Sequence, residues 1–378
     1  MEKKPLSIFL LNCDWRDMFD TSHEEFKDKL QRDQLGGDIN SFFIFSWART
    51  NYFKTRENCT SLHKKTSLDV FRPILDLWTI PAVLFYLFKN KPKHDVWICY
   101  DFGFVPTLWL AQKIWGGKLV MCLNNQPRVY SKTRKFGEVK SAYSWLVEKL
   151  FSGFVWHFFT INQTMKDYIK ALGISESKIS VFSMNTIERD RKFIEKAQKG
   201  IIRKKYGIPD SHKIILTVAR LEAEKNYPKL LELFAGLGEG YSLIALGRGS
   251  MLEQLKEQAR LLGISERIFF PGFVHRDEIW NYYADADVFV LISKAEALGV
   301  VFWEAMYMNV PIVGSDVEGI VETIGKDGDK GRIWKDKMGQ QGFNEILTTI
   351  TSKQDMVQRA KKYVEEKISN RIIINDIV

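Results

Sequence analysis

The chain has 378 residues, which exceeds the usual size of one domain and predicts two. Its 45% hydrophobic and 27% charged residues exclude a disordered chain, and no apolar run reaches the roughly 20 residues of a membrane-spanning helix. The net charge of +9 is uneven, because residues 1–200 carry +10 and residues 201–378 carry −1. We therefore expect an anionic partner to meet the first half.

The first half alternates short apolar runs with longer amphipathic segments, which indicates strands connected by helices. Strands are predicted at residues 6–12, 40–47, 95–101, 118–124, 157–162 and 178–184. Helices fit between them, for example at residues 23–35 and 104–115.

The second half repeats this alternation. Its predicted strands are residues 213–218, 241–246, 267–270, 287–292 and 311–314. Its predicted helices are residues 227–237, 250–262, 276–283 and 300–308. Continuous apolar strands between helices predict parallel sheets covered on both faces, so the expected fold class is α/β.

A polar, lysine-rich stretch at residues 185–212 separates the two halves. We place the domains at residues 1–190 and 191–378, and the last helix is a candidate to pack back on the first domain. In open parallel sheets, ligands bind beyond the carboxyl ends of the strands. With two such domains, the cleft between them is the expected active site.

The segment SKAEALGVVFWEAM, residues 293–306, follows a predicted strand and leads into a predicted helix. The free N–H groups at the start of that helix, from Gly299 onward, form an anion site that the helix dipole favours. Glu304 lies one turn after Val300 on the same helix face, where its carboxylate suits a ribose diol. Glu296, in the loop, can accept hydrogen bonds from sugar hydroxyls. Solvated surface positions explain both glutamates equally well.

The segment ARLEAEKN, residues 219–226, follows the first strand of the second half. Arg220 and Lys225 there suit a diphosphate, because arginine binds as a planar fork and lysine as a mobile point charge. If only one of the two residues were present, a solvated surface cation would be the better explanation for it. Gly247 and Gly249 lie between a strand and a helix, where close approach of a nucleotide and a simple tight turn are both compatible with glycine.

Together these segments resemble the retaining glycosyltransferases of the GT-B fold, specifically glycosyltransferase family 4. The match in order, spacing and residue type covers residues 213–334, and includes RIFFPGFV, EALGVVFWEA and PIVGSDVEGIVETI. Over residues 1–184 the resemblance is architectural. It implies two Rossmann-like doubly wound domains facing a cleft, with the acceptor bound by the first domain and the nucleotide-sugar donor by the second.

The resemblance also implies roles for individual residues. Arg220 and Lys225 would bind the donor diphosphate and stabilise the departing charge, Glu296 would hold donor-sugar hydroxyls, and Glu304 would bind the ribose. The other donor-binding residues it implies are Gly247, Gly249, Phe273, Leu298, Gly299 and Val300. A UDP-, GDP- or ADP-sugar would react with retention of configuration, and the leaving phosphate would accept the acceptor's proton.

The acceptor side departs from the family's pattern. The loop after the first strand reads NCDWRDMF and lacks the glycine pair of many relatives. Asn124 and Asn125 stand where many relatives have a histidine, and an amide cannot perform acid–base work. Asp101, at the end of another predicted strand, is a further candidate for the cleft. A non-catalytic relative also fits these departures.

Cysteine and histidine usage points away from disulfides and metals. The four cysteines show no CxxC pairing, and the six histidines show no metal-ligand spacing. We expect reduced thiols in a cytoplasmic protein, with no bound metal.

A cationic cluster precedes an aromatic stretch in the first half. Lys132, Arg134, Lys135 and Lys140 could meet anionic lipid headgroups at the inner face of a membrane. Trp145, Leu146, Leu150 and Phe151 could then enter the interface. The alternative is that the aromatic residues pack in the core and the lysines are merely solvated.

Competing functions remain open from the sequence. A sugar-nucleotide epimerase or a phosphorylase of similar fold would share much of the donor site, although the paired glutamates favour transfer. A non-catalytic basic protein that binds nucleic acid or a membrane is an alternative of another class. Nucleic acid is disfavoured because the cations do not follow one element with stacking aromatics.

Overall fold

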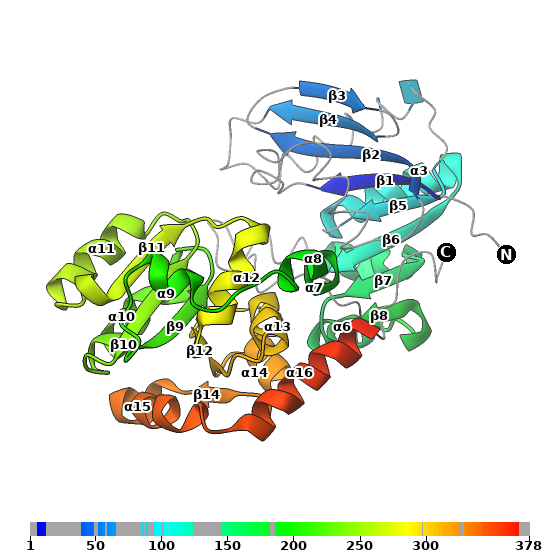
Figure 1. Ribbon diagram of the computed structural model, residues 1–378. Coiled ribbons are helices and arrows are strands. Elements are labelled where there is room, and N and C mark those ends of the chain that lie inside the picture. The colour runs from blue at the N-terminus through cyan, green and yellow to red at the C-terminus, as the bar shows by residue number, and fades with distance from the viewer. Residues whose placement is uncertain are drawn as a thin grey trace. The chain divides into compact units, whose positions relative to one another are not determined.

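The computed structural model describes residues 6–12, 39–48, 52–56, 59–65, 85, 88–89, 94–99, 102–123, 145–181, 186–296, 298–325 and 329–369, and before residue 85 it describes the backbone only. The chain divides into two compact units, Met1–Met184 with Ile372–Val378, and Asn185–Arg371. Each unit contains one predominantly parallel sheet (Figure 1).

The sheet of the first unit has eight strands in the order β3-β4-β2-β1-β5-β6-β7-β8. The strands are β1 (Leu6–Asn12), β2 (Ile39–Ala48), β3 (Tyr52–Arg56), β4 (Cys59–Lys65), β5 (Val96–Cys99), β6 (Lys118–Leu123), β7 (His157–Thr160) and β8 (Ile179–Val181). The helices include α3 (Val105–Trp115) and α6 (Gln163–Ala171). The predicted helix at residues 23–35 lies outside the described residues.

One edge of this sheet corrects the expectation of a purely parallel arrangement. β3 pairs with β4 in antiparallel register, and β4 then pairs in parallel with β2. Neither strand was predicted, because YFKTR and CTSLHKK mix polar and charged residues with few apolar ones. Such sequences suit an edge strand, where charged side chains discourage pairing with another chain.

The core of the first unit forms around the central strands. All four residues of β5 are buried, so other parts of the unit pack against this strand on both faces of the sheet. Trp97, Leu108 and Phe158 belong to one buried cluster, which joins β5, α3 and β7. The proline near the start of α3 is compatible with a first helical turn, where its missing N–H costs nothing.

Two histidines make the stability of the first unit depend on pH. Burial lowers the pKa of His157 to about 4, and burial also lowers the pKa of His94 to about 4 against the opposing charge of Asp95. In the unfolded chain both rings take up a proton near pH 6.5. Protons therefore favour the unfolded state, and the free energy of unfolding should fall as the pH drops from about 6.5 to about 4.

We expect the melting temperature to decrease across this window, and His157→Gln to make the decrease shallower. The glutamine can still bond to Ser180, whose Oγ atom lies 2.9 Å from the His157 ring. Differential scanning calorimetry at several pH values measures the effect. An equally steep decrease in the variant would rule out His157 as its source.

The second unit has a six-stranded, fully parallel sheet in the order β11-β10-β9-β12-β13-β14. Its strands are β9 (Lys213–Val218), β10 (Tyr241–Leu246), β11 (Ile268–Gly272), β12 (Val288–Leu291), β13 (Ile312–Ser315) and β14 (Arg332–Trp334). Its helices are α7 (Thr186–Arg189), α8 (Arg191–Ile194), α9 (Ile201–Lys205), α10 (Tyr227–Ala235), α11 (Leu252–Leu261), α12 (Arg276–Asp285), α13 (Val300–Tyr307), α14 (Glu318–Ile324), α15 (Gly339–Ile350) and α16 (Gln354–Ser369).

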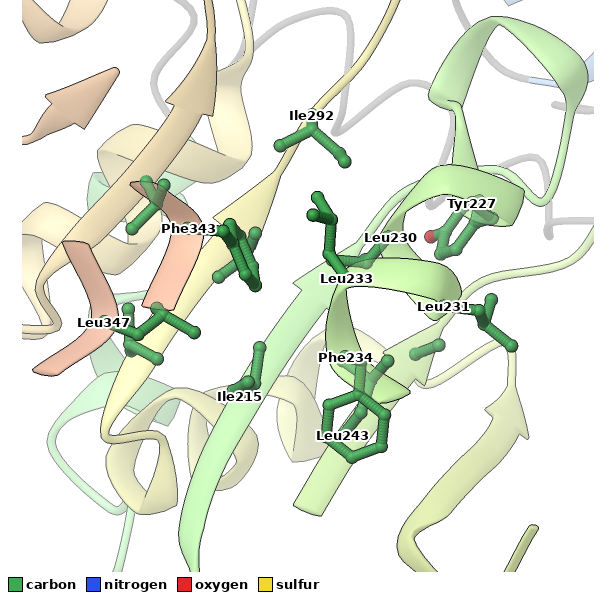
Figure 2. Close-up of a cluster of buried hydrophobic side chains, with 14 of the residues drawn as sticks. Ile215, Tyr227, Leu230, Leu231, Leu233, Phe234, Leu243, Ile292, Phe343 and Leu347 are labelled. Atoms are coloured by element: carbon green, nitrogen blue, oxygen red, sulfur yellow. The ribbon is translucent and has the colours of Figure 1, made fainter. Parts of the chain in front are cut away.

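Helices bury both faces of this sheet. On one face, Ile215 of β9, Leu230 of α10 and Phe343 of α15 belong to one buried cluster (Figure 2). On the other face, the rings of Phe289 in β12 and Phe302 in α13 meet edge to face, with centroids 5.2 Å apart. Consecutive residues of β12 thus point to opposite layers of apolar side chains, because Val288 and Val290 belong to the cluster on the first face and Phe289 packs on the second.

The boundary between the units falls after residue 184, six residues before the predicted one. The difference arises because α7 and α8 belong to the second unit. Asp190, between these two short helices, is 1% exposed and lies 2.5 Å from Arg276 of α12. The last helix, α16, packs on α13 within this unit. Its predicted contact with the first domain stays a prediction.

Candidate functional site

The strand order of the second unit identifies where a ligand would bind. Counted within that unit, the order is 3-2-1-4-5-6, and the direction of winding reverses between β9 and β12. In open α/β sheets, ligands bind at such a switch point, beyond the carboxyl ends of the two neighbouring strands. Both segments that carry the predicted charged residues, 219–226 and 293–306, start at these two strand ends.

The structure brings Lys225 and Glu296 together. The short 3-10 turn Ala223–Lys225 carries the lysine, whose Nζ atom lies 2.6 Å from Oε2 of Glu296. Both side chains are about 15% exposed, at 14% and 15%. This partly buried pair joins the loop after β9 to the loop after β12, and each partner neutralises the other's charge.

Arg220 occupies a more open position. Its side chain is 66% exposed, and its guanidinium donates a hydrogen bond of 2.7 Å to Glu224, four residues later. The backbone around Glu224 is fixed in turn, because its carbonyl accepts the N–H of Lys294 at 2.8 Å. The two loops therefore hold each other through main-chain as well as side-chain bonds.

Gly299 forms the entry to helix α13. Its φ of 63° lies in the left-handed region that favours glycine, and a Cβ atom there would approach the ring of Phe302 to 2.7 Å. Leu298 is anchored because its carbonyl accepts a hydrogen bond of 2.8 Å from Thr323 of α14. This geometry starts the helix at Val300, with its first N–H groups at the carboxyl end of β12.

Gly247 and Gly249 are required by the packing of two loops. A Cβ atom at Gly247 would overlap the carbonyl oxygen of Ala219, and one at Gly249 would overlap that of Leu221. The N–H of Leu221 donates to the carbonyl of Arg248 at 2.9 Å. The glycines after β10 thus let that loop lie against the loop after β9, which is a structural reason for them whether or not a nucleotide also approaches.

Glu304 is buried in a network of its own. It is 2% exposed, Arg276 donates to its Oε1 atom at 2.8 Å, and the Tyr283 hydroxyl donates to its Oε2 atom at 2.7 Å. Burial and the neighbouring Glu304 carboxylate raise the pKa of Tyr283 well above its usual value. Burial alone would lower the pKa of Arg276, but the charges of Glu304 and Asp190 outweigh it and raise that pKa.

Phe273 follows β11 at the same edge of the sheet. Its ring is 54% exposed, and the guanidinium carbon of Arg248 lies 5.3 Å from the ring centroid. The ring of His275 meets it edge to face at 5.3 Å. An exposed aromatic ring beside a planar cation offers a stacking surface for a flat ligand group.

Sequence reasoning missed three residues that shape this region. Arg276 contacts Glu304, and Glu222 accepts hydrogen bonds from the backbone N–H and the hydroxyl of Ser250 at 2.9 and 2.7 Å. These bonds, the backbone one first, lower the pKa of Glu222. The partners are 28 residues apart in both pairs, so spacing within one element could not have revealed them.

The predicted acceptor-side residues Asp101, Asn124 and Asn125 lie outside the described residues, and so do the cations Lys132, Arg134, Lys135 and Lys140. In the part of the chain that the structure describes, no three His, Cys, Asp or Glu side chains are grouped as a metal ion would need. Within the same residues, none of the helices has the length and hydropathy to span a membrane.

Residues 198–367 match the family described as glycosyl transferases group 1. The chain carries a glycosyl transferases group 1 domain. This group 1 domain coincides with most of the second unit and includes every residue of the second half that the sequence proposed for the donor site. The predicted resemblance is thereby confirmed.

Curated relatives match over part of their length. An uncharacterized glycosyltransferase of Methanocaldococcus jannaschii is 29% identical over 219 residues, which cover 56% of this chain and 55% of the relative. The alpha-monoglucosyldiacylglycerol synthase of Streptococcus pneumoniae is 33% identical over 115 residues, or 30% of this chain and 26% of that enzyme. This chain therefore spans about half the length of the first relative and a quarter of the second.

A solved structure shares the fold over nearly the whole chain. The Anabaena protein HepE, crystallised with UDP and glucose, superposes with a TM-score of 0.66 at 15% identity, covering 98% of this chain and 97% of HepE. At this identity the likeness shows the fold. The group 1 domain and the unit before it thus form the two α/β domains of a GT-B glycosyltransferase fold, and the predicted fold class is confirmed.

Proposed function

We propose that this chain is a retaining glycosyltransferase that moves a sugar from a nucleotide-sugar donor to a saccharide or lipid-linked saccharide. The observation that carries the proposal is the pair Lys225–Glu296 at the point where β9 and β12 diverge. A cation for a diphosphate and a carboxylate for sugar hydroxyls are joined there, 2.6 Å apart, inside a group 1 domain.

Donor binding would exchange the partners of this pair. The diphosphate takes Lys225 and Arg220, which leaves Glu296 to accept hydrogen bonds from the donor sugar. The N–H groups of Leu298, Gly299 and Val300 add neutral donors for the phosphate, and no side chain at Gly299 blocks its approach. The ribose binds at Glu304, and the base stacks near Phe273, beyond the loop that contains Gly247 and Gly249.

The transfer step then needs no protein nucleophile. The bond between the anomeric carbon and the diphosphate oxygen breaks, and the acceptor oxygen forms its bond on the same face of the sugar. The acceptor's proton passes to the leaving phosphate, whose growing negative charge Arg220 and Lys225 stabilise. The first domain supplies the acceptor site in this scheme, and no metal ion takes part.

An activity assay tests the proposal directly. A thermal-shift screen with UDP, GDP, ADP and their sugars first identifies the donor, because a ligand of the native state raises the melting temperature. Release of the nucleoside diphosphate is then measured with and without saccharide acceptors. Release that needs an acceptor and forms a new glycoside supports transfer, whereas conversion of the donor sugar without any acceptor supports an epimerase.

The acceptor proposal extends to a membrane surface. Eight large apolar side chains of the first unit are at least 36% exposed: Phe85, Phe88, Leu110, Ile114, Trp145, Leu146, Leu150 and Phe154. Leu110 and Ile114 share one face of α3, and the ring of Trp109 on that helix lies 5.1 Å from the ring of Phe154. The exposed apolar residues therefore extend from α3 to the segment around residue 150.

Cations accompany this apolar surface. Lys89, Lys113 and Lys149 are exposed, and the Lys149 ammonium lies 5.1 Å from the ring centroid of Trp145. Lysines beside aromatic and aliphatic side chains suit the interface of an anionic bilayer, where each basic residue near the surface contributes about 1 kcal/mol. The basic residues from Lys132 to Lys140 would add to this attraction.

We expect the purified chain to sediment with anionic vesicles and much less with neutral ones. A variant with Leu146 and Leu150 changed to serine should lose most of the pelleted fraction, since both side chains are exposed and leave the core intact. The matched control changes exposed Leu261 of the second unit to serine and should pellet like the parent chain. Equal and negligible pelleting with both vesicle types would remove the membrane proposal and leave the transferase proposal standing.

A further inference from the structure

Arg276 joins two carboxylates that are both buried. Its Nη2 atom lies 2.8 Å from Oε1 of Glu304, and its Nε atom lies 2.5 Å from Oδ2 of Asp190. Glu304 is 2% exposed and Asp190 is 1% exposed, whereas the Arg276 side chain is 32% exposed. Arg276 is therefore the most exposed side chain of this three-residue cluster, although its guanidinium is itself partly buried between the two carboxylates.

Each carboxylate has a second donor that does not depend on Arg276. The Tyr283 hydroxyl donates to Oε2 of Glu304 at 2.7 Å, and Nε of Arg189 donates to Oδ1 of Asp190 at 2.7 Å. The guanidinium also lies 5.2 Å from the centroid of the Trp280 ring, which can hold its flat face. Arg276 can thus break its hydrogen bond to one carboxylate while each carboxylate keeps at least one other donor.

We propose that Arg276 is a positioning residue that binds Glu304 before a nucleotide arrives and keeps only its contact with Asp190 when a ribose diol takes its place on Glu304. The inference rests on the proposed function, in which Glu304 binds the ribose. Because Glu304 is almost fully buried and its Oε1 atom accepts the hydrogen bond of Arg276, hydroxyl groups would reach Oε1 by displacing that contact.

Asp190 makes this exchange favourable. A buried charge that loses its partner is strongly destabilising, whereas one that keeps a carboxylate stays compensated. The fork of a guanidinium can serve two carboxylates at once or concentrate on one of them. Asp190, which Arg189 holds in place, therefore remains the carboxylate that pairs with Arg276 while the nucleotide is bound.

The exchange predicts an effect of Asp190 on ribose binding at a distance. In Asp190→Asn, Arg276 retains one carboxylate, Glu304, and a ribose must compete for it. We expect this variant to bind UDP about tenfold more weakly, a loss in the range of one charged hydrogen bond. It should bind 2′,3′-dideoxy-UDP as the parent chain does, because that ligand has no diol to displace Arg276.

Isothermal titration calorimetry with these two ligands tests the inference, or with the matching pair on the base that the donor screen selects. Asp287→Asn is the matched control, since Asp287 pairs with Arg203 in the same unit at 3.5 Å and precedes β12 at the opposite edge of the sheet. Glu304→Gln serves as the reference and should abolish the parent's preference for UDP over the dideoxy ligand.

The outcomes separate the two proposals. A selective loss for UDP in Asp190→Asn, absent from Asp287→Asn and from Asp190→Asn in an Arg276→Gln background, supports the exchange. An equal loss for both ligands in Asp190→Asn, or none, overturns it. If Glu304→Gln leaves the preference for UDP unchanged, the ribose role of Glu304 fails instead. Should Arg276→Gln not fold, the comparison of the two ligands decides the matter without it.

Discussion

Changing Lys225 to alanine should lower turnover about 10²- to 10³-fold, the usual effect of removing one group that stabilises developing charge. The lysine is 14% exposed and lies in the loop after β9, where it can move from Glu296 to a diphosphate without leaving the site. Arg220→Ala should also reduce turnover strongly. Initial rates of nucleoside diphosphate release, measured at saturating donor and acceptor, give the effect.

The control for this prediction is Lys229→Ala. Lys229 lies one helical turn further along, pairs with Glu232 at 3.3 Å on the surface of α10, and has a side chain that is 36% exposed. Its loss should leave the rate unchanged. Near-normal rates in both Lys225→Ala and Arg220→Ala would mean that the diphosphate does not bind at this loop.

Changing Glu304 to alanine should weaken nucleoside diphosphate binding about 10²-fold, whereas Glu296→Ala should leave it nearly unchanged. The difference follows from the proposed contacts, because hydrogen bonds to a charged group contribute about 1.5–3 kcal/mol each and Glu304 would accept two from the ribose. Glu296 would contact the sugar, which the free diphosphate lacks. Its loss should instead reduce discrimination between donors with different sugars.

Calorimetry with the free diphosphate and competition between nucleotide sugars distinguish the two variants. Because Glu304 is buried with Arg276 and Tyr283, the folded state of Glu304→Ala has to be verified by its melting curve, and Glu304→Gln is the gentler substitution. If Glu296→Ala loses affinity for the diphosphate and Glu304→Ala does not, the two roles are reversed.

The sequence was sufficient for the elements that bury apolar residues on both faces. β9 and β10 have the predicted bounds, since KIILTV and YSLIAL are almost continuously apolar between turn signals. β14 was missed because RIW is three residues long, which gives no period to recognise. The antiparallel β3 was missed because its alternation is masked by charged residues.

The sequence predicted the individual residues of the site better than the contacts between their side chains. The residue types and the strand ends identified Arg220, Lys225 and Glu296 as candidates, but the sequence did not indicate that the last two pair with each other. Gly249 had two explanations, and the structure supplies one of them in the backbone of Leu221. Side-chain pairs between distant segments depend on the packing of whole elements, which no local pattern encodes.

The charge pairs of the candidate site also bear on how the product of the proposed reaction would leave. Arg220 is held by Glu224, Lys225 by Glu296, and Arg276 by Glu304. In the proposed function, a diphosphate that binds Arg220 and Lys225 would break their bonds to Glu224 and Glu296, and these bonds would re-form when it leaves. Glu224 and Glu296 would then compete with the product diphosphate for the two cations, which would favour release of the product, a step that limits the rate of many enzymes.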